Sequence, residues 1–243
     1  MIRPTMRYVA IKCPEQQAVL MLHRTRELLV RQRTMLVNAL RGHLAEYGII
    51  APQGLPSVPK LREVAEKARG AALPELAWRC IRLILAQIED VHGRIGQVEQ
   101  EILAWHRRNE VSQRLETIPG GGIITASAIA ATITNPNSFR SGRHLAAWIG
   151  LVPRQSGTGG IVRLGHISKQ GDRYLRRLLV LGASTLLRHA RGKASAPAGW
   201  INALLVRRPA GIVKIAIANK LARVAWAVLQ GTLGYRAPTS AAA

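Results

Sequence analysis

The sequence predicts a mainly α-helical protein in which long antiparallel or coiled-coil helices precede a helical domain containing a helix-hairpin-helix. Three observations lead to this prediction. Apolar residues recur at spacings of three and four along the first half of the chain, segments rich in Gly and Pro interrupt those patterns, and the second half combines small apolar residues with many arginines. With 48% apolar residues among 243, the chain can bury a core.

The net charge indicates the class of partner. The chain has 35 Lys and Arg against 13 Asp and Glu, a net charge of +22, and a polyanion is the expected ligand. Asp172 is the only acidic residue after Glu116, so the second half cannot by itself supply the carboxylates of a two-metal site. Cys13 and Cys80 have no partner pattern for a disulfide or zinc site. We expect a cytoplasmic, nucleoid-associated protein without a membrane span.

The opening residues, 1–14, predict one short strand or its remnant, and residues 15–47 predict a long amphipathic helix. Its apolar pairs Met21/Leu22, Leu28/Leu29 and Met35/Leu36 recur every seven residues. Its other face, which is either a solvated surface or a phosphate track, carries Arg24, Arg26, Arg31, Arg33 and Arg41. Residues 48–60 contain enough Pro and Gly to form a connector.

A second long helix, within the segment 15–116, shows the clearest periodicity in the chain. Spacings of four and three alternate through Ala77, Ile81, Ile84, Ile88, Val91, Ile95, Val98, Ile102 and Trp105. Such a narrow coiled-coil seam must be covered by another helix. The cover is either the helix at 15–47 folding back, or the same helix of a second chain in a dimer or tetramer.

The C-terminal domain, 117–235, opens on "LETIPGGGIITASAIAATI", in which glycines separate a helix ending near Glu116 from a small-residue helix beginning near Thr125. This pattern resembles the helix-hairpin-helix motif, whose backbone N–H groups at a helix N-terminus bind phosphate. The candidate DNA contacts are Gly120, Gly121, Gly122 and Thr125. The alternative is a turn with a structural role only.

Further along, the stretch "NPNSFRSGRHLAAWIGLVP" predicts a turn and a short helix. We expect Leu145, Trp148 and Ile149 to face inward, and Arg140 and Arg143 to contact phosphate. Asp172 then caps a helix whose Leu175, Leu178 and Leu179 face the core and whose outer face carries Arg173, Arg176 and Arg177. Residues 236–243 predict a disordered tail.

Between these helices lies "RQSGTGG", residues 154–160, predicted as a loop. Its glycines allow the backbone to approach a ligand closely, and the surrounding cations are Arg154, Arg163, Lys169 and Arg173. A hydroxyl in such a positive field suits nucleophilic attack on phosphorus. A plain surface loop is the alternative, and His144 and His166 beside it are expected to be surface groups or phosphate contacts.

Taken in order, "LETIPGGGIITASAIAATI", "FRSGRHLAAWIGLVPRQSGTGG" and "RLGHISKQGDRYLRRLLVLGA" resemble the C-terminal domain of bacterial insertion-sequence transposases of the IS110 family, to which the pilin-gene invertases are related. The upstream stretch from Arg3 to Ile49 resembles the family's middle region. The resemblance implies strand exchange on DNA by a dimer, a serine that bonds covalently to a DNA phosphate, and an RNA that guides the choice of DNA. It also implies a preceding RuvC-like domain whose acidic residues bind divalent metal such as Mg²⁺.

Two departures from the family pattern shape the expectations. Residues 1–14 contain no Asp or Glu, so we expect a truncated or internally started copy that keeps a remnant of the RuvC-like domain, holds no metal and is inactive alone. In the loop, Gly157 occupies the usual serine position, which leaves Ser156 as the candidate nucleophile and Thr158 as the reserve. A non-enzymatic nucleic-acid-binding remnant that modulates full-length transposase is the alternative function.

Overall fold

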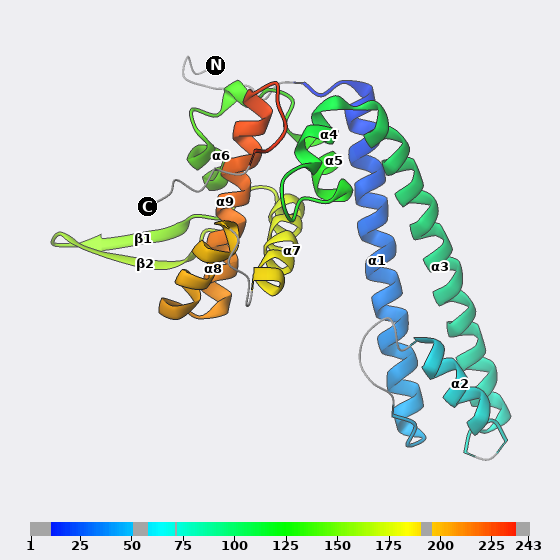
Figure 1. The fold of residues 1–243 in the computed structure, drawn as a ribbon. Helices are drawn as coiled ribbons and strands as arrows, with labels where there is room; N and C mark the ends of the chain where they lie inside the picture. Colours follow the sequence, from blue (N-terminus) through cyan, green and yellow to red (C-terminus); the bar gives the residue numbers. More distant parts are fainter. Residues whose placement is uncertain (1–10, 51–57, 71, 191–195, 237–243) are drawn as a thin grey trace, which may run out of the picture. The chain divides into compact units, whose positions relative to one another are not determined.

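The computed structural model describes residues 11–50, 58–70, 72–190 and 196–236, and the prediction of a mainly helical fold is confirmed (Figure 1). Two compact units emerge. One, here called the arm, is Met21–Glu101, and the other, the basic domain, comprises Met1–Leu20 and Ile102–Ala243. The strand predicted at 1–14 falls mostly on residues 1–10, which lie outside the described residues, as does the predicted tail from residue 237 onward.

The arm contains most of helices α1 (Pro14–Glu46) and α3 (Glu75–Arg108), which pack together with α2 (Val58–Ala68). Their core includes Leu40 and Leu44 of α1, Leu61 of α2, and Ile81 and Ile88 of α3. Every residue of the predicted α3 seam is buried or half-buried. The cover is α1 of the same chain, as in the hairpin alternative, and assembly through the arm stays a prediction.

The predicted face of α1 was only partly right. Met21, Leu28 and Met35 are exposed, because only one residue of each adjacent pair can point toward a neighbouring helix. The inward positions on α1 instead include two arginines that the sequence placed on the outer face. Arg26 Nη2 lies 2.6 Å from Glu99 Oε1, and Arg33 Nη1 lies 2.9 Å from His92 Nδ1.

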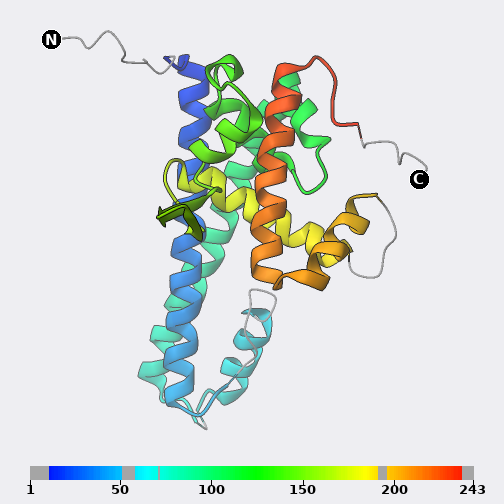
Figure 2. The same cartoon turned by 90° about the vertical axis from the view of Figure 1, so that its left-hand side faces the viewer.

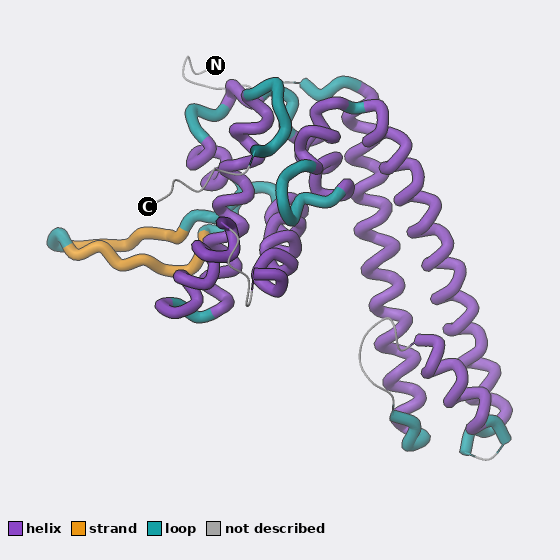
Figure 3. Tube along the Cα trace, viewed as in Figure 1, coloured by secondary structure: helices purple, strands orange, loops and turns teal. Residues whose placement is uncertain are grey.

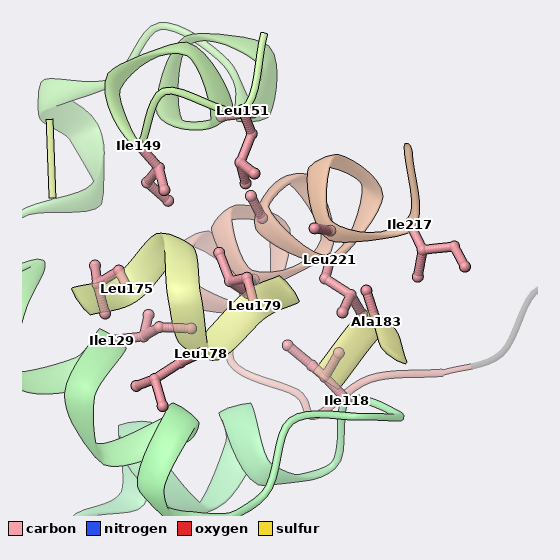
Figure 4. Close-up of a cluster of buried hydrophobic side chains, with 14 of the residues drawn as sticks. Ile118, Ile129, Ile149, Leu151, Leu175, Leu178, Leu179, Ala183, Ile217 and Leu221 are labelled. Atoms are coloured by element: carbon pink, nitrogen blue, oxygen red, sulfur yellow. The ribbon is translucent and has the colours of Figure 1, made fainter. Parts of the chain in front are cut away.

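The basic domain packs its helices around α9 (Ala210–Gln230), which contacts α4 (Glu110–Glu116), α6 (Gly142–Trp148), α7 (Arg173–Ala190) and α8 (Ala196–Arg207). Figure 2 shows α7 crossing α9. The core between them and α5 (Ile123–Thr132) includes Ile129, Leu179 and Leu221 (Figure 4). Leu175, Leu178 and Leu179 face this core as predicted, and Asp172 caps α7 by accepting the Leu175 N–H at 2.9 Å.

The expectations for Trp148 and for residues 154–160 were wrong. Trp148 is 41% exposed, whereas its neighbours Leu145 and Ile149 are buried, because the end of the short helix α6 turns the indole outward against Phe139. The predicted loop at residues 154–160 is most of a β-hairpin, formed by β1 (Pro153–Thr158) and β2 (Ile161–Ile167). Figure 3 shows these strands projecting from the helices of the domain. A short 3-10 turn, η2 (Pro136–Ser138), precedes α6.

No helix in the described part of the chain combines the length and the apolar character needed to cross a membrane.

A buried histidine makes the arm sensitive to pH. His23 is 1% exposed, and burial lowers its pKa from 6.5 to about 4, with the charge of Arg26 acting in the same direction. The unfolded chain therefore binds a proton at this position below pH 6.5, whereas the folded chain does not. Acid favours the unfolded state in the window between these two values.

We expect the free energy of unfolding to fall by about 2 kcal/mol between pH 7 and pH 5 through His23 alone. Urea titrations followed by circular dichroism at both pH values would measure the change. His23→Leu has no titratable group at this position, so the fall in its free energy of unfolding should be smaller by about that amount. An equal fall in the variant and the unsubstituted chain would contradict the assignment.

Candidate nucleic-acid interface

The base of the hairpin is held by two segments whose backbones lie in contact. The N–H groups of Ser168 and Lys169 donate to the carbonyls of Val152 and Gly150 at 2.9 and 3.2 Å. A Cβ on Gly171 would lie 1.8 Å from the Trp148 carbonyl oxygen, and one on Gly150 would lie 2.2 Å from that of Gln170. Both glycines have positive φ, so only glycine fits here without strain.

Arg176 completes this base rather than facing solvent. Its Nη1 donates to the carbonyl oxygens of Ile149 and Gln170, both at 2.8 Å, and so joins α7 to both segments. The sequence predicted Arg176 as an outward DNA contact, but these two hydrogen bonds give it a structural role. Arg173 and Arg177 on the same helix are exposed, as expected.

The strands of the hairpin are antiparallel, and Gly159 and Gly160 at its tip both have positive φ. Two such residues between paired strands make a type I′ turn. Ser156 pairs with Arg163, Thr158 with Ile161, and Gly157 with Val162. Because side chains alternate across a strand, one face of the hairpin carries Ser156, Thr158, Ile161 and Arg163, and the other carries Gln155, Val162 and Leu164.

Gly157 has no room for a side chain in this hairpin. A Cβ there would lie 2.6 Å from the carbonyl oxygen of Ile161 on the opposite strand. A serine at the position where the resemblance expects one would push the strands apart. The exposed hydroxyls at Ser156 and Thr158 are the ones that this hairpin can present to a ligand.

An open groove with a volume of about 1800 Å³ lies between the base of the hairpin, the start of α6, α8 and one face of α9. Its lining residues, all in the described part of the chain, include no Asp or Glu. Six basic side chains line it, and all six are exposed: Arg143, His166, Lys169, Arg208, Lys220 and Arg223. We call this the basic groove. Such a surface attracts a polyanion.

The walls of the basic groove are fixed by close packing. A Cβ on the buried Gly142, at the start of α6, would lie 3.0 Å from the backbone of Arg223, so α6 meets α9 at backbone distance. Asn219 Nδ2 donates to the Leu151 carbonyl at 3.3 Å and ties α9 to the segment before the hairpin. Lys220 Nζ lies 4.1 Å from the centre of the Trp200 ring. These contacts place cations from separate elements on one surface.

The predicted site residues divide between several places. Arg143 and Lys169 line the basic groove, while Arg154 and Arg163 lie on the exposed hairpin. Arg140 is exposed just before α6, and its N–H donates to His144 Nδ1 at 3.3 Å.

The glycine turn at residues 120–122 packs against α7, but at a different part of that helix from the hairpin base. Gly120 has positive φ and packs against Gly182, where a Cβ would lie 2.2 Å from the Gly120 oxygen. Gly182 is about 14 Å along α7 from Arg173 at its start. Gly121 is half-buried and Thr125 is buried, which leaves Gly122 as the exposed residue at the start of α5. The turn therefore has a packing role, whether or not it also contacts DNA.

Sequence reasoning missed Trp200, Arg208, Lys220 and Arg223 as site residues. Lys220 and Arg223 are three residues apart in a helical pattern, so they lie on one face of α9, and this spacing was a usable signal. No comparable signal pointed to Trp200 or Arg208, because only the tertiary fold brings α8 to the same surface.

The described residues of the site do not form a metal-binding cluster. Among the described residues there is no group of three His, Cys, Asp or Glu side chains that could hold an ion. The divalent metal implied by the sequence resemblance therefore has no ligand set in this part of the chain.

Comparison with known proteins gives a consistent result. Residues 112–197 match the family model described as Transposase IS116/IS110/IS902 family. The chain is 45% identical over 235 residues to a probable family 20 transposase of Pseudomonas aeruginosa, covering 96% of this chain and 70% of that protein. It is 42% identical over 237 residues to a putative transposase of Sinorhizobium fredii, covering 97% and 61%.

A third relative is the transposase for insertion sequence element IS1328 of Yersinia enterocolitica. It is 38% identical over 232 residues, which cover 95% of this chain and 69% of that protein. The chain thus spans between 61% and 70% of the length of these three relatives.

We expect Gly171→Ala to lower the free energy of unfolding of the basic domain by about 2–4 kcal/mol, since the new Cβ would collide with the Trp148 carbonyl and the backbone has positive φ. Urea unfolding followed by circular dichroism measures the loss. Gly199→Ala, in α8 with nothing within 4 Å of the new Cβ, should be neutral or raise stability by up to about 1 kcal/mol. Equal stabilities of the two variants would refute the close backbone contact.

Proposed function

Since the chain belongs to the IS116/IS110/IS902 family of transposases, we propose that its basic groove binds the sugar-phosphate backbone of insertion-sequence DNA and that its hairpin carries the nucleophile for strand transfer. The observation that supports this most directly is a groove with six exposed basic residues and no carboxylate in its lining. Phosphate contacts of this kind provide affinity for any sequence and position the protein on the duplex.

The arrangement of the cations suits a phosphate backbone better than a single small anion. Lys220 and Arg223 project from α9, Arg143 from α6, and Lys169 from the hairpin base. Cations drawn from separate elements spread along the groove can each meet a different phosphate. A structured RNA has the same backbone charge, so we expect it to compete for this groove.

In the proposed strand-transfer step, the Ser156 oxygen bonds to a DNA phosphorus. The bond from that phosphorus to a sugar oxygen breaks, the serine proton passes to a base or to water, and the released sugar oxygen gains a proton. Arg163 pairs with Ser156 across the hairpin, and directly opposed side chains have Cβ atoms about 5 Å apart. Its positive charge can stabilise the anionic phosphorus centre. Thr158 lies on the same face and is the second candidate.

No step is assigned to a metal, because the described residues provide no ligand set for one.

The proposed function leads to two predictions, and the first concerns the basic groove. The double variant Lys220→Ala/Arg223→Ala should bind a mixed-sequence duplex more weakly, because it loses two phosphate contacts. The slope of log affinity against log salt should become shallower by about 2. Fluorescence anisotropy at a series of salt concentrations measures both quantities.

The control for this experiment is Arg188→Ala/Arg207→Ala, which removes the same charge from exposed residues outside the groove lining. Its salt slope should stay close to that of the unsubstituted chain. Equal slopes for the two double variants would show that the affinity comes from overall charge and would refute the groove as the DNA site.

The second prediction concerns the hydroxyl. We expect the chain, mixed with a full-length family transposase because the chain is expected to be inactive alone, to form a covalent adduct with duplexes that carry the genomic sequence flanking its gene and contain bridging phosphorothiolates, whose thiol leaving group prevents rejoining. Ser156→Ala should abolish the adduct, while Thr158→Ala should retain it. Denaturing gels and mass spectrometry of the linked peptide identify the residue. Loss only in Thr158→Ala would move the role to Thr158, and an adduct that survives both substitutions would contradict the hairpin assignment.

A further inference from the structure

The hairpin exposes more apolar surface than its own fold explains. Ile161, Val162 and Leu164 are 66%, 65% and 67% exposed, and β1 has no buried or half-buried residue. An isolated two-stranded hairpin is at best marginally stable in water. Large apolar side chains gathered on a projecting element usually mark a binding surface.

The two faces of the hairpin differ in character. Val162 and Leu164 lie on one face, where Gly157, which pairs with Val162, adds no side chain and Gln155, which pairs with Leu164, adds an amide. The opposite face carries the hydroxyls of Ser156 and Thr158 together with Arg163 and Ile161. Leu164 also lines the basic groove, so the apolar face is continuous with that surface. A molecule bound along the groove would meet Leu164 first and Val162 next toward the tip.

Charge determines which kind of partner fits. Between Thr117 and Gly171 the sequence contains no Asp or Glu, while the hairpin itself carries Arg154, Arg163 and His166. An apolar strip flanked by basic and neutral side chains, with no carboxylate, suits a ligand that is both anionic and apolar. Duplex DNA has phosphates at the rim of its major groove and base edges, including the thymine methyl group, at its floor.

The dimensions agree with this partner. Paired strands lie about 4.8 Å apart. The DNA major groove, about 12 Å wide, admits a two-stranded ribbon as it stands, whereas the minor groove, about 6 Å wide, has to be widened for strands to enter it. The Gly159–Gly160 tip adds no side-chain bulk at the end that would enter first.

We infer that the β1–β2 hairpin is a DNA-reading arm that enters the major groove and places Val162 and Leu164 against base edges, while the basic groove holds the adjacent backbone. This inference rests on the proposed binding of DNA in the basic groove. It makes Val162 and Leu164 determinants of base contact, separate from the hydroxyl on the other face.

Two duplexes of the same mixed sequence test this inference. In one, the cytosines are replaced by glucosylated hydroxymethylcytosine, whose sugar fills the major groove and leaves the minor groove open. The unsubstituted chain should bind this duplex about tenfold more weakly than the unmodified one, since apolar contacts to base edges are lost. Val162→Ser, at a position outside the groove lining, should bind the two duplexes with nearly equal affinity and keep the original salt slope.

Leu181→Ser serves as the matched control, because Leu181 is exposed to a similar degree on α7 and does not line the groove. It should retain the tenfold discrimination, and circular dichroism would show that all variants fold. Unchanged affinity of the unsubstituted chain for the glucosylated duplex would overturn the inference, as would displacement by netropsin, a minor-groove ligand. Tighter binding to double-stranded RNA would also overturn it, because the RNA major groove is too narrow for the hairpin.

Failure of this inference is distinguishable from failure of the proposed function. If the basic groove does not bind DNA, the Lys220→Ala/Arg223→Ala variant keeps its salt slope. If only the hairpin inference is wrong, the salt slope of that variant still becomes shallower, while the unsubstituted chain binds the glucosylated and the unmodified duplex with equal affinity.

Discussion

The backbone contact between residues 148–152 and 168–171 is the constraint on which the functional surface depends. Gly150 and Gly171 let the two segments approach closer than any side chain would allow, and Arg176 joins both to α7. The hairpin has no core of its own, so its direction is set at this base. Because Asn219 links α9 to Leu151 in the same region, the hairpin and the basic groove are positioned by one set of contacts.

Charge imposes a second constraint, which acts against folding. With Asp172 as the only acidic residue after Glu116, the cations of the second half have almost no carboxylates to pair with. Asp172 itself caps α7. Mutual repulsion among these cations must be offset by apolar burial between α5, α7 and α9, where Ile129, Leu179, Ala183 and Leu221 are nearly inaccessible to solvent. A bound polyanion relieves the same repulsion, so ligand binding and stability should be linked in this domain.

Much of the fold could be predicted from periodicity, and the errors share a physical origin. The α3 seam, the Asp172 cap and the inward leucines of α7 follow from local spacing, which a sequence displays directly. The inward face of α1 could not be predicted, because adjacent apolar pairs are compatible with more than one rotation of the helix about its axis. The ion pair between Arg26 and Glu99, a tertiary contact, shows which rotation is adopted. The hairpin was missed although two glycines separate paired strands, since the glycines were interpreted as flexibility for ligand approach rather than as a turn. Arg208 and Lys220 belong to one surface only through tertiary packing.

The separation of the glycine turn from the hairpin changes how the basic domain should be understood. The sequence predicted Gly120 as a DNA contact, like the arginines around Ser156, but Gly120 packs against Gly182, well along α7 from the hairpin base. What remains together is a groove of cations beside an arm with an apolar face and a hydroxyl face. Such a division lets backbone contacts set position while the arm contacts bases or a reacting phosphate, because the two tasks require opposite chemistry. Gly157 is compatible with both tasks, since it leaves the apolar face smooth and the strands close enough to hold Ser156 opposite Arg163.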